Sequence, residues 1–377
     1  MIPYGKQSID DEDIAAVISA LKSDFLTTGP LVEAFENSLA RYTASAYAVA
    51  VSSGTAALHC AMYALGIGPG DEVIVPPMTF AATANSVCFQ GGTPIFVDVE
   101  PDTLLIDPLK IEEKITTKTK AIIGVDYAGQ TCDWDQIRQI ANKHNLTLVA
   151  DSCQALGAEY KNVKTGSLAD MTVFSFHPVK HITTGEGGMI TTEQENYAHR
   201  MRLFRNHGIS TDFRQREQQG SWFYEMMDLG YNYRLTDIQS ALGLTQMKKL
   251  PAFLNRRRQI AIQYDQAFNT MASISPLHKK EDCLHAYHLY IIKIDTDILS
   301  RSLAFSRLRQ AGIGVNVHHV PVHLHPFYQK TFGYGRGLCP VAEQAYETIL
   351  SLPIWPGMND MDIEKVMDEV KTVMSKK

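Results

Sequence analysis

The sequence predicts an α/β fold in which a mainly parallel sheet is flanked by helices and is followed by a smaller α+β domain. Two observations support this prediction. Short apolar runs alternate with longer amphipathic runs between about residues 45 and 192, a pattern typical of buried parallel strands joined by helices. After about residue 270 this regular alternation ends, and strand-like and helical runs follow in a different pattern. We therefore expect a large domain over residues 1–245 and a small C-terminal domain over residues 246–377.

The first predicted elements are helices. Apolar residues at positions 14, 17, 18 and 21 recur at helical spacing, and Asp10 or Asp11 is placed to cap this helix. Pro30 suits the first position of a second helix. The strands expected next cover residues 47–51, 72–75, 94–99, 121–125, 146–150, 171–176 and 188–191, and the helices between them include 55–65, 80–90 and 134–144.

A long helical pattern covers residues 236–268. We expect Pro251 to bend or break this helix, and we interpret the arginine run at 256–258 as a solvated helix face. In the small domain, the elements in order are a strand-like run at 285–294, a helix, a strand-like run at 312–322 and a terminal helix at 361–373.

Composition excludes several classes of protein. The 377 residues are 45% hydrophobic and 20% charged, which is typical of a globular protein. Acidic residues outnumber basic ones by 41 to 35, whereas nucleic-acid binders usually carry a basic surplus. No run approaches the ~18 apolar residues of a membrane helix, the opening residues lack the apolar segment of a signal peptide, and the six cysteines form no C-x-x-C pair. We expect a cytoplasmic protein with reduced cysteines and no nucleic-acid or membrane partner.

Ligands of open α/β sheets bind at the carboxyl ends of the strands. Residues 53–56, Ser-Gly-Thr-Ala, follow the first predicted strand and open a helix. The free N–H groups and the positive dipole end of such a turn suit a phosphate group. Ser53 is also the residue type of an ordinary N-cap, and for the turn taken alone this alternative is the more frequent one.

Two ionisable residues follow later strands. Asp151 directly follows the run 146–150. A buried carboxylate needs a partner because its desolvation is costly, and a cationic ring nitrogen would be a suitable partner. The common alternative is an Asp that caps the next turn. Lys180 follows the run 171–176. A lysine beside apolar walls becomes nucleophilic and can form a Schiff base with an aldehyde; a surface lysine is the alternative.

Together these residues match the needs of pyridoxal 5′-phosphate (PLP). This cofactor requires a lysine for its aldehyde, a carboxylate for its pyridine nitrogen and a cup for its phosphate. The carboxylate keeps the nitrogen protonated, which makes the ring an electron sink. Phe80, which follows the run 72–75, could stack on the ring or pack in the core.

Three runs resemble a known family: DSCQALGA at 151–158, SFHPVKHITTGEGG at 175–188 and YNYRLTDIQSALGLTQ at 231–246. They are similar to the DegT-type aminotransferases, fold-type I PLP-dependent transferases that act on nucleotide-linked keto-sugars, and the resemblance spans essentially the whole chain. Further runs resemble the subgroup that acts in pseudaminic acid biosynthesis. These runs are MIPYGKQ at 1–7, DFLTTGP at 24–30, VDYAGQ at 125–130, GSWFYEMMDLGYNYR at 220–234 and GVNVHHVPVHLHPFY at 314–328.

The resemblance implies roles for the matching residues. Lys180 matches the Schiff-base lysine, and Asp151 matches the partner of the pyridinium nitrogen. Gln154 matches a residue near the phenolic oxygen of the cofactor, and Phe80 matches the stacking residue. The positions that match contacts to the phosphate and the rest of the cofactor are Gly54, Thr55 and Ser175.

The resemblance also implies an assembly and a substrate pocket. Asn232 matches an asparagine that reaches the phosphate from the neighbouring subunit, which implies a homodimer with composite sites. Arg234 is a candidate for the carboxylate of the amino donor, because a guanidinium suits bidentate binding; a structural salt bridge is the alternative. The positions that match the lining of the nucleotide-sugar pocket are Tyr4, Asp24, Phe25, Leu26, Thr27, Val317, His318, His319 and Val320.

Some residues depart from the pattern or permit other roles. Thr28 stands where related members often carry Gln, and His319 stands where Tyr is frequent, so the substrate is less closely specified than the reaction. His177 and His181 flank the lysine and either line the pocket or have local structural roles. The histidines at 318, 319, 323 and 325 suggest a metal, but adjacent strand residues point to opposite faces, and we expect no metal site.

The expected reaction is a transamination. L-glutamate gives its amino group, Lys180 moves the proton, and C4 of a UDP-linked keto-sugar receives the amine. Two alternatives stay open: another nucleotide-linked keto-sugar such as a dTDP-4-keto-6-deoxyhexose, and a non-catalytic PLP-binding regulatory protein. A dehydratase is disfavoured because those relatives carry histidine in place of the lysine.

Overall fold

The computed structural model describes residues 1–218 and 220–375. Over these residues the central sheet has seven strands in the order β1-β9-β8-β5-β4-β2-β3. Strand β9 runs antiparallel to β1 and β8, and the other pairs are parallel, which confirms the predicted mainly parallel sheet. The strands are β1 (Tyr47–Val51), β2 (Glu72–Val75), β3 (Thr93–Phe96), β4 (Thr119–Val125), β5 (Thr147–Asp151), β8 (Met171–Ser175) and β9 (Gly188–Thr192).

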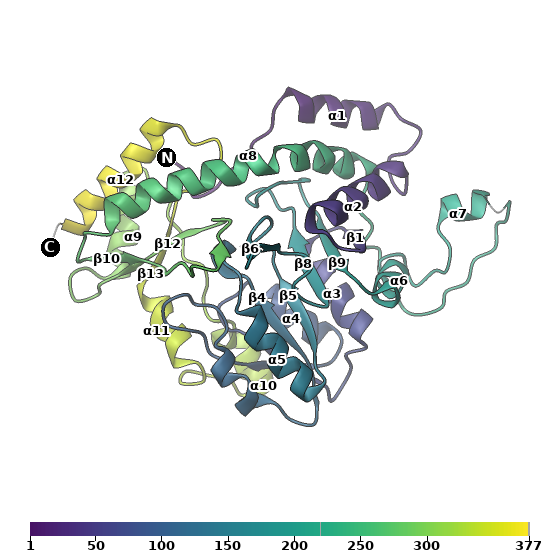
Figure 1. Cartoon of the computed structure of the whole chain (residues 1–377), viewed down its shortest axis with the longest axis horizontal. Coiled ribbons are helices and arrows are strands. Elements are labelled where there is room, and N and C mark those ends of the chain that lie inside the picture. Colours follow the sequence, from purple (N-terminus) through teal and green to yellow (C-terminus); the bar gives the residue numbers. More distant parts are fainter. Residues whose placement is uncertain (219, 376–377) are drawn as a thin grey trace.

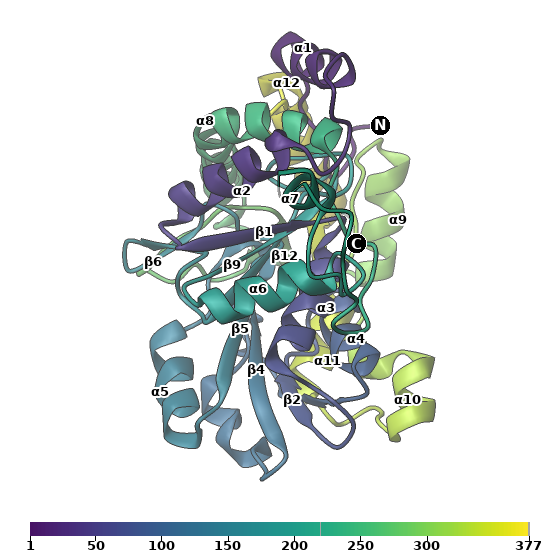
Figure 2. The same ribbon diagram turned by 90° about the vertical axis from the view of Figure 1, so that its right-hand side faces the viewer.

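Helices cover both faces of this sheet (Figure 1 and Figure 2). Successive strand residues point to opposite faces, so Val49 and Val51 of β1 join the core that includes α3, whereas Ala48 and Ala50 join the core that includes α2 and α8. The elements around the sheet are α2 (Pro30–Thr43), α3 (Gly54–Leu65), α4 (Ala82–Phe89), α5 (Trp134–His144), α6 (Glu195–Phe204) and the short 3-10 helices η1 (Pro108–Lys110), η2 (Glu112–Lys114) and η3 (Tyr127–Gly129).

The predicted strand at 94–99 is shorter in the structure, because β3 ends at Phe96. Two residues further on, the buried Asp98 carboxylate accepts hydrogen bonds from the backbone N–H groups of Val341 and Ala342. These groups belong to the first turn of α11 (Pro340–Thr348). The chain leaves the sheet at this point to cap a distant helix, and the local apolar pattern does not reveal that contact.

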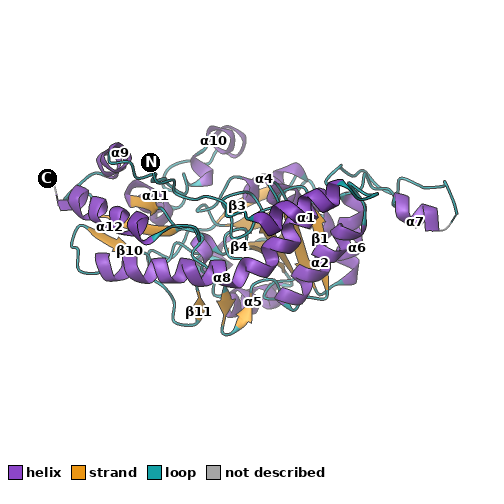
Figure 3. Ribbon diagram, turned by 90° about the horizontal axis from the view of Figure 1, so that it is seen from above, coloured by secondary structure: helices purple, strands orange, loops and turns teal. Residues whose placement is uncertain are grey.

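Helix α8 (Asp237–Phe268) is a single long helix that runs along the molecule (Figure 3). It continues through Pro251, so the predicted break is absent. Its first half packs on α2 and on α1 (Asp11–Leu21), and its second half enters the core of the C-terminal part. The predicted domain boundary between residues 245 and 246 falls inside α8, and the division into two domains stays a prediction. Although α8 has 32 residues, no described helix is both long and apolar enough to cross a membrane.

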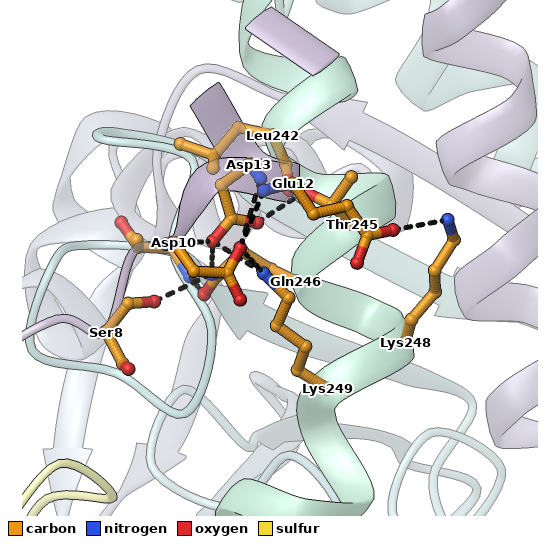
Figure 4. A network of polar contacts seen from close by, with 10 residues as sticks. Ser8, Asp10, Glu12, Asp13, Leu242, Thr245, Gln246, Lys248 and Lys249 are labelled. Atoms are coloured by element: carbon orange, nitrogen blue, oxygen red, sulfur yellow. Dashed lines mark hydrogen bonds and ion pairs between the residues drawn. The ribbon is translucent and has the colours of Figure 1, made fainter. Parts of the chain in front are cut away.

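The start of α1 is tied to α8 by a buried polar network (Figure 4). Asp10 caps α1 in a reciprocal capping box, as predicted. The fully buried Asp13 carboxylate accepts a hydrogen bond from Thr245 Oγ1 at 2.5 Å and pairs with Lys249 Nζ at 2.8 Å. A buried carboxylate is stable only when it is paired and hydrogen-bonded, so these contacts fix the position of α1 on α8.

The same network reaches the loop that follows Lys180. Gln246 Nε2 donates to Asp13 Oδ2 and to the backbone oxygen of Ser8, both at 2.9 Å. Gln246 Oε1 accepts from the backbone N–H of Thr183 at 3.4 Å. One buried amide therefore joins the N-terminal segment, α1 and the lysine-bearing loop.

The interpretation of the arginine run as a solvated face is wrong. Arg257 is fully buried, and its Nη1 donates to the backbone oxygens of Tyr287 at 3.0 Å and Ile354 at 2.8 Å. Arg256 and Arg258 also donate to backbone oxygens. Backbone carbonyl groups of the loops that end against α8 need hydrogen-bond donors, and the three arginines provide these donors. Burial lowers the pKa of Arg257 to about 9.

The C-terminal part is built on an antiparallel sheet in the order β10-β12-β13. The predicted strand at 285–294 is confirmed only for its second half. The terminal helix is confirmed as α12. The elements of this part are β10 (Ile274–Pro276), β12 (Tyr290–Ile294), α9 (Arg301–Gln310), η4 (Val322–Leu324), α10 (Pro326–Phe332), α11, β13 (Ile349–Leu352) and α12 (Asp360–Ser375), with a small separate sheet made by β6 (Glu159–Tyr160), β7 (Val163–Lys164) and β11 (Cys283–Leu284).

The predicted strand at 312–322 is wrong. This segment forms isolated bridges instead of a ladder, because the N-terminal residues take its pairing positions. The backbone N–H of Ile2 donates to Gly312 at 2.8 Å, and the N–H of Gly314 donates back to Ile2 at 2.6 Å. Asn316 exchanges backbone hydrogen bonds with Ser351. The segment that carries His318 and His319 is therefore an irregular loop.

An arm, defined as residues 206–218 and 220–230, projects from the body and carries α7 (Phe213–Gln218) at its far end (Figure 1 and Figure 3). Its base is fixed by a cluster of rings in which His59 contacts Phe204 and Tyr231 at centroid distances of 5.0 Å. Several large apolar side chains of the arm are exposed. They are Trp222, Phe223, Tyr224, Met226, Met227 and Leu229.

The buried histidines predict how stability depends on pH. His59, His181, His285 and His288 are at most 9% exposed. Burial lowers the pKa of His59 to about 4 and of His285 to about 3, and it lowers the pKa of His181 and His288 well below 6.5. The unfolded chain takes up protons on these rings below about pH 6.5, whereas the folded chain does not, so stability falls as pH drops from 6.5 toward 4.

We predict a urea midpoint that is nearly constant from pH 8 to 7 and that falls steeply from pH 6.5 to 5. Each such histidine contributes up to about 1.4 kcal/mol per pH unit in this window. The variant His59→Gln should show a shallower fall than the wild type. A midpoint that stays level down to pH 5 would contradict the neutral state of these rings.

Candidate functional site

The predicted site residues lie at the carboxyl ends of neighbouring strands. Asp151 is the last residue of β5 and stands opposite Val173 of the parallel neighbour β8. Lys180 lies in the loop after β8, where its backbone N–H closes a turn onto the oxygen of His177 at 2.9 Å. Ser53 and Gly54 follow β1 and open α3. The parallel pair β5–β8 brings the acid and the lysine to one edge of the sheet. Strand β1 runs in the same direction as β8, because both are antiparallel to β9, so the glycine turn lies at the same edge.

The Asp151 carboxylate is held by two donors. Thr83 Oγ1 donates to Oδ2 at 2.7 Å, and the backbone N–H of Cys153 donates to Oδ1 at 3.2 Å. Thr79 Oγ1 lies 2.7 Å from Thr83 Oγ1. Since a hydroxyl has a single proton, Thr79 donates to Thr83 and Thr83 to the acid. The local turn cap given as the alternative for Asp151 is thus present, and its role as partner of a ring nitrogen stays a prediction.

Sequence reasoning missed Thr79 and Thr83. Their side chains are buried, at 2% and 0% exposure, and they form the hydroxyl chain that leads to Asp151. The spacing T-F-A-A-T at 79–83 places two hydroxyls on one side of a helical turn. That spacing was the available signal, but it does not identify the acid that the hydroxyls contact.

The glycine turn is closely packed, so a larger residue at position 54 would require its neighbours to move. A Cβ on Gly54 would lie 3.0 Å from Ser175 Cβ and 3.2 Å from Cys153 Sγ. Ser53 caps α3 by accepting from the N–H of Ala56 at 3.1 Å, so the N-cap interpretation is confirmed. The cap uses one of the free N–H groups of the first turn, and the positive end of the α3 dipole remains beside Gly54, Thr55 and Ser175.

Opposing effects act on the pKa of the Lys180 side chain. Desolvation lowers the pKa of its ammonium group below the ordinary 10.5, whereas Cys153 and Asp151 act in the opposite direction. A lowered pKa increases the fraction of neutral amine at physiological pH. The side chain is therefore suited to act as a nucleophile and as a base.

Gln154, Phe80 and His319 lie together beside these residues. Gln154 Oε1 accepts from the N–H of Ala128 at 2.8 Å, and its Nε2 lies 3.4 Å from His319 Nε2. The rings of Phe80 and His319 are 6.2 Å apart. Phe80 is 64% exposed, which excludes the alternative that it packs in the core.

The N-terminal segment and the loop at 317–320 also meet at this place. Tyr4 packs its ring 5.3 Å from that of His318. A Cβ on Gly5 would lie 3.5 Å from Val179, the residue before Lys180. His318 is fixed by a hydrogen bond of 2.9 Å between its Nδ1 and Ser351 Oγ, and desolvation lowers its pKa to about 4. Val317 and Val320 belong to the same loop and are half-buried.

Other predicted residues lie elsewhere. The segment Asp24, Phe25, Leu26 and Thr27 runs beside the start of α8, where the N–H of Asp237 donates to the oxygen of Leu26 at 3.0 Å. Asn232 is exposed and forms a backbone bridge with Asn206. Arg234 donates to Asn206 Oδ1 at 2.9 Å.

Arg234 and Thr28 line a cavity of about 680 Å³ between α2, α6 and the arm, and Lys180 does not line this cavity. Thus the structure brings Tyr4 and His318 together beside the lysine-bearing loop, whereas Arg234 faces this other cavity. The backbone of Tyr233, next to Asn232, accepts a hydrogen bond from the N–H of Ser52 beside the glycine turn at 2.8 Å.

The described residues contain no group of three or more His, Cys, Asp or Glu side chains that could hold a metal ion. Of the C-terminal histidines, His323 instead donates from Nε2 to Glu343 Oε1 at 2.9 Å. His181, next to the lysine, is buried and lies 3.2 Å from the backbone oxygen of Ala286, which supports a structural role. His177 is exposed.

The fold is that of fold-type I aminotransferases, with a lysine and an acid at the carboxyl edge of a mainly parallel sheet. Residues 7–371 match the DegT/DnrJ/EryC1/StrS aminotransferase family. The chain belongs to this family.

Relatives in several bacteria cover the whole chain. The spore coat polysaccharide biosynthesis protein SpsC of Bacillus subtilis is 41% identical over 99% of this chain and 97% of its own length. The putative sugar aminotransferase Spr1654 of Streptococcus pneumoniae, solved in its PMP form, is 35% identical with a TM-score of 0.94 and 99% coverage of both chains. PseC of Helicobacter pylori, an aminotransferase of pseudaminic acid biosynthesis, is 34% identical with a TM-score of 0.92 and 99% coverage of both chains.

The environment of Lys180 predicts the effect of removing the acid. In the variant Asp151→Asn the charged form of Lys180 loses a favourable interaction, so its pKa should fall by roughly one unit. The pH profile of Lys180 acylation in the cofactor-free protein, followed by peptide mass spectrometry, should shift to lower pH. Acylation of the exposed Lys118 is the internal control. An unchanged profile for Lys180 would show that the two groups do not interact.

Proposed function

We propose that this protein transfers the amino group of L-glutamate to C4 of a UDP-linked 4-keto-6-deoxy-N-acetylhexosamine. This is the reaction of UDP-4-amino-4,6-dideoxy-N-acetyl-β-L-altrosamine transaminase in pseudaminic acid biosynthesis. The observation that carries the transaminase part is the convergence of Lys180, Asp151 and the Gly54 turn at one sheet edge. The likeness to PseC over 99% of both chains supports the choice of sugar.

The cofactor is PLP, and the residues present fit it. Gly54, Thr55 and Ser175 surround the positive end of α3, where a phosphate is favoured. Asp151 is 6% exposed and is held by Thr83 and the backbone N–H of Cys153, and its carboxylate would hold the protonated ring nitrogen. Phe80 presents an exposed ring for stacking. When bound, PLP supplies an aldehyde for the amino group and a ring that delocalises an electron pair.

Lys180 is the group of this chain that would move protons. Its lowered pKa leaves the amine able to take a proton from the amino donor and to return it to the sugar carbon. The balance is complete without an oxidant, since L-glutamate becomes 2-oxoglutarate as the keto-sugar becomes an amino sugar. Tyr4, Val317, His318, His319 and Val320 would line the sugar side.

A second candidate has its own support. SpsC, named for spore coat polysaccharide biosynthesis, is 41% identical to this chain, which exceeds the 34% identity to PseC. An aminotransferase for a different nucleotide-linked keto-sugar, including a dTDP-4-keto-6-deoxyhexose, is therefore the alternative. A PLP-binding regulator without turnover would show the cofactor spectrum but no half-reaction with L-glutamate.

A panel of purified UDP- and dTDP-linked 4-keto sugars tests the proposal. With L-glutamate as donor, we expect the UDP-linked 4-keto-6-deoxy-N-acetylhexosamine to give the highest kcat/KM, measured by product mass and by 2-oxoglutarate release. The variant Lys180→Ala should lower turnover more than about 1,000-fold, because it removes the group that moves the proton. Preference for a dTDP sugar would favour the second candidate, and substantial turnover by Lys180→Ala would refute the assignment of the lysine.

We further propose a cytoplasmic homodimer in which each active site is completed by its neighbour. Asn232 and Arg234 match residues of the cofactor and donor sites; Asn232 is exposed and bridges to Asn206, and Arg234 lines a cavity that Lys180 does not line. They stand at the base of the arm, whose exposed apolar side chains suit a protein contact. A second copy of the chain would bring Asn232 to the phosphate bound near Gly54.

Mixed dimers test this arrangement. Lys180→Ala and Asn232→Ala carry their defects in different halves of a composite site, so a mixed dimer contains one intact site. After co-refolding of equal amounts, activity should recover to about one quarter of the wild type, as expected for random pairing in a two-fold dimer. Each variant refolded alone is the control. If mixing gives no recovery, Asn232 acts within its own chain or not at all.

A further inference from the structure

The orientation of the Gln154 amide is fixed by the backbone. Its Oε1 accepts from the N–H of Ala128 at 2.8 Å, and a backbone N–H can only donate. The amide NH₂ of Gln154 must therefore point away from Ala128. The atom that it meets is His319 Nε2, at 3.4 Å.

This contact determines the tautomer of His319. Because the Gln154 NH₂ only donates, the Nε2 of His319 must be the acceptor, and in a neutral ring the proton then lies on Nδ1. A charged ring would place two donors face to face. The titratable neighbours Lys180, His318 and His325 are all basic, and together with desolvation they lower the pKa of His319 well below 6.5.

The Nδ1–H group of His319 remains available. Over residues 1–218 and 220–375, no hydrogen-bond partner is found for this atom, and Nδ1 is not among the fully buried atoms that lack a partner. The ring lies 6.2 Å from that of Phe80 and 5.0 Å from that of His318. Both neighbours are positions that line the proposed cofactor and sugar sites.

We propose that His319 is a positioning residue that acts in its neutral Nδ1–H tautomer: Nε2 holds the Gln154 amide in place, and Nδ1–H donates to an oxygen of the sugar substrate. The first role concerns the cofactor side, because Gln154 matches the residue near the phenolic oxygen of PLP. The second role rests on the proposed function. In family members that carry Tyr at this position, a single hydroxyl would stand in place of the two ring nitrogens, one an acceptor and the other a donor.

Two variants separate the two nitrogens. The amide of glutamine occupies the region of Nε2, and the amide of asparagine occupies the region of Nδ1. His319→Gln should keep the acceptor for Gln154 and lose the donor to the sugar. His319→Asn should keep a donor near Nδ1 and lose the acceptor. His319→Phe removes both, and retention of the fold is checked by circular dichroism.

The expected effects follow from the loss of single hydrogen bonds. Relative to the wild type, His319→Asn should bind PLP about 3–10-fold more weakly, with a KM for the keto-sugar within about twofold. His319→Gln should bind PLP within about twofold of the wild type but raise the keto-sugar KM about 3–10-fold. PLP binding is measured by titration of the cofactor-free protein, so it is independent of turnover.

A direct test of the tautomer uses histidine labelled with ¹⁵N. In the cofactor-free wild type at pH 7.5, the signal that disappears in His319→Gln should have the shift of a protonated Nδ1 and an unprotonated Nε2. A protonated Nε2, or PLP affinity unchanged in His319→Asn, would overturn the proposal. If the panel yields no sugar substrate, the proposed function fails, while the tautomer and the PLP affinities still decide the role toward Gln154.

Discussion

The pairing of β5 with β8 is the constraint on which the site depends. It places the Asp151 carboxylate beside the strand whose continuation carries Lys180. A carboxylate buried to this extent is costly unless it is hydrogen-bonded, and the hydroxyl of Thr83 together with the N–H of Cys153 meets that need. The acid is therefore ready to face a cation before any ligand arrives. A one-residue slip in this register would turn the carboxylate to the other face of the sheet.

The proposed substrate side is built from different parts of the chain than the proposed cofactor side. Tyr4 comes from the N-terminal segment, and His318 and His319 come from an irregular loop of the C-terminal part. The buried amide of Gln246 joins the N-terminal segment to the loop after Lys180. Because the proposed sugar contacts are not on the strands that hold Asp151 and precede Lys180, they can vary without a change in the residues that support transamination. This separation explains why the reaction is better defined than the sugar.

The sequence predicted the strands well because their apolar runs are buried on both faces. It also predicted that Lys180, Asp151 and Gly54 lie at or after strand ends, because the ends of those runs are visible in it, while their roles stay predictions. The predictions were wrong where the local structure depends on a contact with a residue that is distant in the sequence. Arg257 lies in a run of charges that resembles a solvated face, but carbonyls from two other segments surround it. Residues 312–322 alternate like a strand, yet Ile2 occupies their pairing positions. Thr83 has no local pattern that reveals its contact with Asp151.

The central claim is that position 180 carries the cofactor opposite the acid at 151. The most direct measurement is borohydride reduction of the PLP-loaded protein followed by peptide mass spectrometry. We expect a pyridoxyl-phosphate group on Lys180 and on no other lysine, with the same label reduced or absent in Asp151→Ala at limiting PLP. A label on a different lysine, or a protein that takes up no PLP, would contradict the account.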